Sequence, residues 1–351
     1  MRKLIIIFLI SVFAPAVYGQ DKPLTQPEFV RMLYSLERNF SEKDSVIDAL
    51  RRRGIDFVLN DGIRSLARNK GKNDRELRRA LEEADRRRRD PVASAPPSVK
   101  EADQILKKTR QNTLAAVEEM PDFVVKQQIQ RSAAYAGTNN FQTLDRLIVA
   151  VSYRSSGNEE YKVLSINGAI QNNPETKKSY EQVGGTSSTG EFVSVLATIF
   201  RPESETVFEV VDTDLILGRR AVVFDFSIER DKAKQQITSV GYISDSVITG
   251  MRGRIWIDRE EFRVLRLESE ATEIPPDFPV SSAKRIIDYD WTAIGDQKYL
   301  LPAMSDVRLV DRGRKPSFET RNLIRFKEYQ KFGTEVTVIE EDNAPIEEKK
   351  P

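Results

Sequence analysis

The first part of the chain has apolar residues at the spacing of amphipathic helices. Phe29, Leu33 and Leu36 recur every three or four positions, and further groups between residues 46 and 81 do the same. Breaks that contain glycine and asparagine separate these groups, and Asn73 or Asp74 is suited to cap the last one. The pattern predicts a small domain of four short helices over residues 24–89.

A change of composition follows at residues 90–97, which read Asp-Pro-Val-Ala-Ser-Ala-Pro-Pro. Proline and small residues in this density are typical of a semi-rigid linker. We therefore place a domain boundary here, and a length of 351 residues agrees with two domains.

One helix and then a long series of strands are predicted after the linker. Ser98 and Glu101 have capping-box spacing, and an apolar stripe at helical spacing follows over residues 99–120. From residue 122 the period changes to two, through about ten strands joined by hairpins such as Asn167–Gly168 and ending at 336–339. A sheet of this size must curl or close.

The fold class that follows is α+β. We predict a small N-terminal helical module plus a curved antiparallel β-sheet, an incomplete barrel over residues 98–340, with helices on its concave side. Residues 341–351 are charged and contain proline, so they are predicted to form a disordered tail.

A glycine-rich segment at 184–190 precedes a second predicted helix at 190–200. Glycine-rich backbone ahead of a helix can hold a phosphate, but the lysine and hydroxyl that complete a nucleotide-binding loop are absent. Ser188 and Glu191 have capping-box spacing, so we interpret the segment as a plain loop and helix cap.

Composition removes many kinds of chemistry. The sequence has neither histidine nor cysteine, which excludes an imidazole base, a thiolate nucleophile, a His or Cys zinc site and disulfides. Carboxylates, Ser/Lys pairs and oxygen-ligated cations remain. The net charge of +1 gives no drive toward nucleic acid, and we expect no cofactor.

Residues 1–19 have the form of a secretory signal peptide. Arg2 and Lys3 precede an apolar run of about ten residues, which is too short to span a bilayer, and a cleavage point follows near Gln20. The mature protein is therefore expected in the periplasm or associated with the cell envelope, and soluble after cleavage of the signal.

Two groups of charged residues allow more than one interpretation. Arg86, Arg87, Arg88 and Arg89 could make peripheral contact with lipid phosphates, or they could be a solvated helix end, which we favour. Acidic residues in two neighbouring strands could serve acid–base work or bind calcium, but strand alternation favours surface ion pairs with arginines. These acidic residues are Glu268, Glu270, Glu273, Asp288 and Asp290.

Aromatic side chains are spread over many predicted strands. A curled sheet brings such residues together on its concave side, where they form either ordinary core or the wall of a cavity for an apolar ligand. In the second case helices 99–120 and 190–200 would act as plug or lid. The candidate cavity residues are Phe208, Phe224, Phe226, Trp256, Tyr289, Trp291 and Phe326, and Tyr329 belongs to the same pattern.

The order of elements and one hairpin sequence resemble a known superfamily. Residues 253–268 read Gly-Arg-Ile-Trp-Ile-Asp-Arg-Glu-Glu-Phe-Arg-Val-Leu-Arg-Leu-Glu, and Leu300-Leu301-Pro302-Ala303 follows. Together with the signal, the amphipathic helix and the paired strands, residues 98–340 are similar to the outer-membrane lipoprotein carrier (LolA-like) superfamily. This stretch and residues 53–57 also resemble exported proteins of acidobacterial type. The resemblance implies an incomplete barrel with a helical lid that binds acyl chains of lipoproteins or related lipids.

Functions of three classes remain open. The leading hypothesis is an exported, non-enzymatic binding protein that holds an apolar ligand, a lipid or acyl chain, in a half-barrel. The second is a protein-interaction scaffold of the cell envelope that acts through its helical domain. The third is a carboxylate-based hydrolase.

Export predicts a processed N-terminus. Because the basic start and short apolar run are features of a cleaved signal, sequencing of the mature protein should begin near Gln20. Recovery of the chain from the cytosol with Met1 intact would contradict this expectation.

Overall fold

The structure is a computed structural model that describes residues 22–171, 192, 194–233, 235–239, 245–312, 315–333, 336 and 338–346. The signal region and the glycine-rich segment at 184–190 lie outside the described residues. The chain divides into two compact units, residues 1–93 and 94–351. Among the described helices, none is long and apolar enough to cross a membrane.

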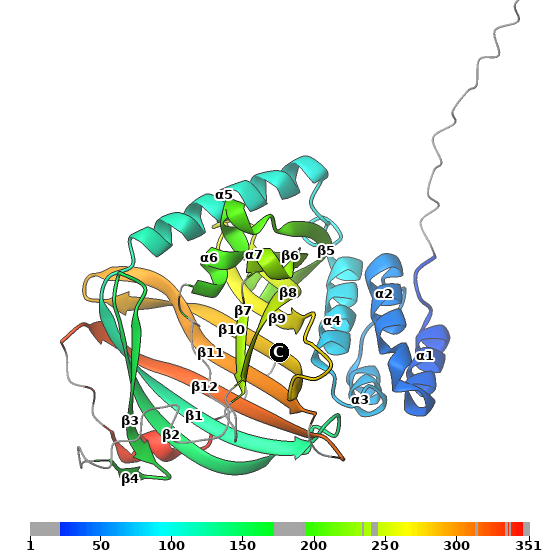
Figure 1. The fold of residues 1–351 in the computed structure, drawn as a ribbon. Helices are drawn as coiled ribbons and strands as arrows, with labels where there is room; N and C mark the ends of the chain where they lie inside the picture. Colours follow the sequence, from blue (N-terminus) through cyan, green and yellow to red (C-terminus); the bar gives the residue numbers. More distant parts are fainter. Residues whose placement is uncertain are drawn as a thin grey trace, which may run out of the picture. The chain divides into compact units, whose positions relative to one another are not determined.

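The described part of the first unit is helical, and the prediction of four helices is confirmed (Figure 1). Each helix buries one apolar stripe in a shared core that includes Phe29, Leu50 and Leu77. Asp74 caps the last helix, because its Oδ1 accepts a hydrogen bond from the amide of Leu77 at 2.9 Å. The elements are α1 (Gln26–Arg38), η1 (Phe40–Glu42), α2 (Lys43–Arg53), α3 (Asp61–Lys70) and α4 (Arg75–Arg89).

The arginine run at the end of α4 is engaged within its own unit. Arg86 pairs with Glu83 at 2.5 Å, and Arg88 and Arg89 pair with Asp85 at 2.9 and 3.0 Å. Arg87 donates to the carbonyl of Arg51 at 2.8 Å. Ion pairs one helical turn apart neutralise much of the run, which favours the structural interpretation over lipid contact.

The second unit is a curled antiparallel sheet with helices on one face (Figure 1). Among the described residues the sheet has twelve strands, in the order β4-β3-β2-β1-β12-β11-β10-β9-β8-β6-β5 with β7 paired to β8, and it is not closed. The strands are β1 (Phe123–Tyr135), β2 (Gln142–Tyr153), β3 (Glu159–Ile166), β4 (Ala169–Ile170), β5 (Val207–Ile216), β6 (Arg219–Ile228), β7 (Gln235–Ser239), β8 (Asp245–Asp258), β9 (Val264–Thr272), β10 (Val280–Ile294), β11 (Gln297–Asp311) and β12 (Phe318–Lys331).

The predicted helices and hairpins explain this arrangement. Helix α5 (Val99–Glu118) begins where Ser98 caps it, accepting from the amide of Glu101 at 3.2 Å. Asn167 and Gly168 have φ of 50° and 82°, so they form the tight turn that joins β3 to β4. The predicted α+β class and incomplete barrel are therefore confirmed.

One row of residues that pair directly from strand to strand, called here the register line, shows which face of the sheet the helices cover. The line crosses ten strands, from β3 to β5, through directly paired residues on the helix-covered, inward face. All but one of its members are apolar: Ile166, Leu147, Ile129, Ile324, Ser305, Ile287, Leu267, Ile255, Phe224 and Val210. Because strand neighbours alternate, the adjacent line on the outer face includes Arg266, Asp288 and Gln128.

Ion pairs cover the outer face. Arg266 is 3% exposed and donates to Glu268 at 2.7 Å and to Asp288 at 2.6 Å, as the sequence predicted for these carboxylates. Asp306 accepts from Arg321 at 2.8 Å and from Arg308 at 3.2 Å. Burial by itself would raise the pKa of Asp306, but hydrogen bonds from Arg321 and the charges of both arginines outweigh it and hold that pKa below its ordinary value.

The C-terminal segment differs from the prediction. The described residues of 336–339 form no strand, and residues 340–343 form the 3-10 helix η5 (Glu340–Asn343) where a disordered tail was expected from 341. Asp342 is buried on the outer face, where it accepts from Lys126 and from Gln128, each at 2.8 Å. A buried cation on β1 needs a buried anion, and this segment supplies it.

The Asp306 ion pairs predict a pH-dependent contribution to stability. Asp306→Asn removes the carboxylate that Arg321 and Arg308 share, so the free energy of unfolding should fall by about 3 kcal/mol near pH 7. Because the folded pKa is depressed, this contribution is present above about pH 4 and is lost as the pH falls through the folded pKa. Unfolding curves from pH 7 to pH 2 should show the two proteins converge.

The control for this series is Asp103→Asn, at an exposed position of α5. It should follow the wild type at every pH. A difference between Asp306→Asn and wild type that does not change with pH would contradict the assignment.

Candidate functional site

The inward face of the sheet is covered by helices, and apolar clusters lie between the two layers. α5 turns Ala102, Ile105, Thr109 and Thr113 toward the sheet, and α6 (Ser194–Phe200), η4 (Pro202–Ser204) and α7 (Arg230–Ala233) lie beside it. One cluster joins α5 and α6 to β6, β8, β9 and β10. A second joins the end of α5 to β1, β2, β3, β11 and β12. Figure 1 shows α5 lying across the curled sheet.

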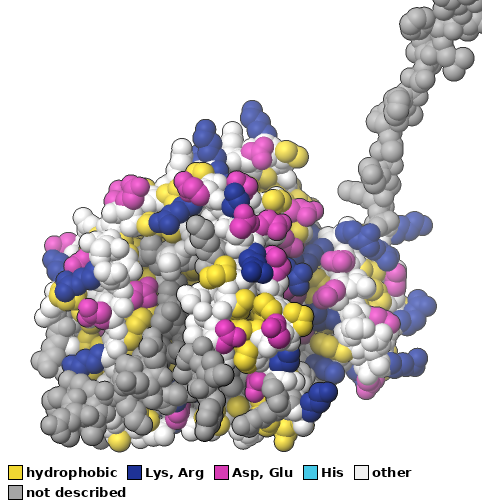
Figure 2. All heavy atoms as spheres, in the orientation of Figure 1, with side chains coloured by type: hydrophobic (Ala, Val, Ile, Leu, Met, Phe, Trp, Pro, Cys, Tyr) yellow, Lys and Arg dark blue, Asp and Glu magenta, His cyan; other side chains and the backbone are white. Residues whose placement is uncertain are grey.

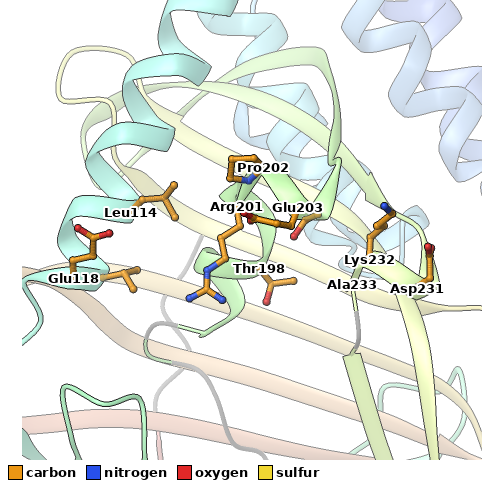
Figure 3. Close-up of a pocket in the computed structure, with 11 residues that line it drawn as sticks. Leu114, Glu118, Thr198, Arg201, Pro202, Glu203, Asp231, Lys232 and Ala233 are labelled. Atoms are coloured by element: carbon orange, nitrogen blue, oxygen red, sulfur yellow. The ribbon is translucent and has the colours of Figure 1, made fainter.

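A cavity of about 810 Å³ opens between α5, the α6–η4 segment and α7. Its size falls in the range of small-molecule sites. Leu114, Val117, Pro202 and Ala233 give it apolar walls, and Val117 and Ala233 also contact the two clusters. The remaining lining residues are polar or charged: Glu118, Thr198, Arg201, Glu203, Ser204, Asp231 and Lys232 (Figure 3).

The charged side chains at this cavity have unequal partners. Lys232 pairs with Glu205 at 2.8 Å, and the pKa of Lys232 is raised by that hydrogen bond and by the charge of Glu205. Arg201 forms no ion pair with any described residue, and Figure 3 shows its guanidinium reaching toward the space between Glu118 and Thr198. The cavity therefore combines apolar walls with a charged rim that water or a polar head group can contact.

The predicted aromatic residues divide between the two clusters. Phe224, Phe226 and Tyr289 belong to the first cluster, and Phe208 is partly buried against it, stacked on Phe200 at 5.7 Å between ring centroids. Phe326 and Tyr329 belong to the second, where both contact Phe192. The structure thus brings these six to the inward face, although none of them lines the cavity.

Trp256 and Trp291 differ from the expected placement. Trp256 lies on the outer face with Val223 and Leu265, and its Nε1 donates to Asp214 at 3.0 Å. The reason is register, since Ile255 and Ile257 on either side of it face inward. Trp291 is 39% exposed and therefore not enclosed in an apolar interior.

Three of the acidic residues noted in the sequence, Glu268, Glu270 and Asp288, lie in ion pairs. Within the described residues no group of three or more acidic side chains could hold a metal ion. Glu270 pairs with Arg252 and Lys284. Burial by itself would raise the pKa of Glu270, but the hydrogen bond from Arg252 and the charges of Lys284 and Arg252 together outweigh it and lower that pKa. A depressed pKa keeps the carboxylate charged and makes it a poor general acid.

Sequence reasoning missed most of the residues that line the cavity. Leu114 lies one position off the apolar stripe of α5, while Arg201 and Lys232 belong to short segments between strands. Local sequence gives no signal that these residues meet, because the cavity depends on how three separate helices pack on the sheet.

Comparison with known proteins gives likenesses of fold. No protein-family model matches the chain, and no curated protein is similar in sequence. The LolA superfamily protein NE2245 from Nitrosomonas europaea has 12% identity over 64% of this chain and 94% of its own, with a TM-score of 0.28. A domain named as an outer membrane lipoprotein-sorting protein from Vibrio parahaemolyticus has 11% identity over 69% and 97%, with a TM-score of 0.30.

A third solved structure is the complex of MucA with MucB from Pseudomonas aeruginosa, with 11% identity over 63% of this chain and 93% of the matched chain and a TM-score of 0.17. The names of the first two structures refer to the LolA superfamily and to lipoprotein sorting, the superfamily that residues 98–340 resemble in sequence. At this identity the likeness says nothing about ligand or partner.

Placement of the aromatic residues predicts opposite outcomes for two substitutions. Phe224→Asp buries a charge in the first cluster, so it should lower the free energy of unfolding by more than about 3 kcal/mol. Trp291→Asp changes a side chain that already contacts water, so its effect should stay under about 1 kcal/mol. Thermal unfolding of both variants measures the difference. Equal losses would show that Trp291 is as buried as Phe224.

Proposed function

We propose that this protein is an exported, non-enzymatic binding protein that holds the apolar part of an amphiphile between its open sheet and its helices. The observation that carries the proposal is the cavity between α5, α6–η4 and α7, which adjoins both apolar clusters. Its apolar walls suit a lipid or acyl chain, and its charged rim suits a head group that stays in water. The proposed site of work is the periplasm or cell envelope.

The residue chemistry of this chain agrees better with a binding role than with a hydrolase. The chain has no histidine or cysteine, and the described acidic pairs Arg266–Glu268 and Arg321–Asp306 are held by arginines on the outer face, away from the cavity. Catalytic carboxylates need access to a substrate and a pKa matched to proton transfer. Asp306 has neither, because it is buried and its pKa is held below the ordinary value.

The interaction scaffold is the second candidate, and charge distribution favours it in one respect. Residues 22–93 contain 18 Lys and Arg against 13 Asp and Glu, a net charge of +5 in a protein whose total is +1. Figure 2 shows acidic and basic side chains interspersed over the face in view. An excess of this kind on the helical unit suits an acidic partner.

Binding of a fluorescent fatty-acyl probe to the mature full-length protein tests the proposed function. The wild type should bind the probe, and Leu114→Asp should weaken binding at least tenfold, because a carboxylate in the apolar wall must lose water when the chain enters. Ala115→Asp is the matched control, since Ala115 is the exposed next residue of the same helix and does not line the cavity.

Three outcomes separate the possibilities. Loss of binding in Leu114→Asp alone, with an unchanged melting temperature, supports the cavity. Equal loss in both variants points to a general charge effect. Absence of probe binding by the wild type would overturn the proposal and would favour the interaction scaffold instead.

A further inference from the structure

Polar side chains at a few inward positions interrupt the apolar interior. Gln127 of β1 is fully buried, and its register partners Val149 and Phe326 both belong to the second cluster. Ser305 of β11 is 1% exposed and lies between Ile324 and Ile287 on the inward register line. These positions are where alternation demands an apolar residue, so polar side chains there need an explanation.

Within the part of the chain that the structure describes, neither side-chain atom of Gln127 has a hydrogen-bond partner. Its Nε2 and Oε1 are both buried and unpaired, and the Oγ atoms of Ser305 and Thr109 of α5 are in the same state. A hydroxyl has one proton to place, but a glutamine amide leaves two donors and an acceptor without partners. Such a group costs stability in the free protein, because burial removes its bonds to water and supplies nothing in return.

The adjacent residue makes the contrast clear. Gln128 has the same side chain and is also buried, but it faces outward and its Nε2 donates to Asp342 at 2.8 Å. Gln128 therefore holds the C-terminal segment on the outer face. Gln127, one position away, holds no described part of the chain.

The chemistry of an unpaired amide restricts what can satisfy it. A group that both donates and accepts, such as an amide or a hydroxyl, can bond to Nε2 and Oε1 together. A carboxylate would bring a charge to a face where the register line has no cation to pair with it, and a plain hydrocarbon would leave the amide as it is. Val117 connects the cavity to the cluster around Gln127, because it lines the cavity and packs on that cluster.

We propose that Gln127 is a specificity-determining residue that binds an uncharged amide or hydroxyl group of the amphiphile whose chain enters between α5 and the sheet. The inference rests on the proposed function and adds to it the class of ligand: a chain that carries a neutral hydrogen-bonding group, in preference to a free fatty acid or a plain hydrocarbon. Ser305 and Thr109 offer further hydroxyls on the facing layers.

The first measurement compares the stability of two matched variants. Gln127→Leu should melt at the same temperature as the wild type or higher, because it replaces an unpaired buried amide with an apolar side chain of similar size. Gln128→Leu should melt at a lower temperature, because it removes a bond to buried Asp342. A loss in Gln127→Leu as large as that in Gln128→Leu would show that Gln127 is structural and would overturn the inference.

The second measurement uses two fluorescent probes of equal chain length, one with a secondary amide in the chain and one with only hydrocarbon, on the mature full-length protein. The wild type should bind the amide probe at least fivefold more tightly. Gln127→Leu should abolish that preference while it keeps its affinity for the hydrocarbon probe, and Gln128→Leu should retain the preference.

The results separate this inference from the proposed function. Equal binding of both probes by the wild type, or a preference that survives in Gln127→Leu, would overturn the role of Gln127 alone. Failure of the wild type to bind either probe would overturn the proposed function, and the inference with it.

Discussion

The inward face of an open antiparallel sheet has to be covered, and the rest of the second unit depends on this requirement. A register line of almost unbroken apolar residues crosses ten strands, and a sheet that does not close cannot bury that line against itself. α5 supplies most of the cover from the segment that precedes the sheet. The apolar clusters, the cavity at the helices and the burial of Gln127 all follow from the way one helix and several short pieces meet this demand.

The outer face solves a different problem with charges. Its strands carry arginines and carboxylates that pair across neighbouring strands, as Arg254 does with Asp225 and Arg266 with Asp288. On the edge strand β5, Asp212 and Asp214 each accept from the amide of the next residue, at 2.8 and 2.7 Å. Because the outer face carries charges and the inward face is apolar, the helix-covered inward face is the side that can shelter an apolar ligand.

The sequence predicts features that depend on neighbouring residues and fails where distant residues decide. The helix of residues 99–118, its Ser98 cap and the Asn167–Gly168 turn are local and were predicted. The inward position of Phe224 and Tyr289 follows from strand alternation. The same aromatic pattern placed Trp256 on the wrong face. An aromatic residue alone does not show whether the odd-numbered or the even-numbered residues of its strand face inward. The C-terminal segment was missed because the partners Lys126 and Asp342 are 216 positions apart.

The structure also relates two hypotheses that the sequence kept separate. A filled scaffold and a carrier use the same inward face, and they differ in how firmly the helices hold it. α5 has twenty residues, whereas α6 has seven and α7 has four, so the short helices have few internal hydrogen bonds and depend on contact with the sheet. An apolar chain that enters between α5 and α6 exchanges one apolar contact for another, so the apolar burial of the sheet changes little. Whether such a chain binds then depends on polar groups in the interior. A buried amide without a partner is stabilised by a ligand that can form a hydrogen bond with it, whereas a hydrocarbon wall gains nothing from that bond.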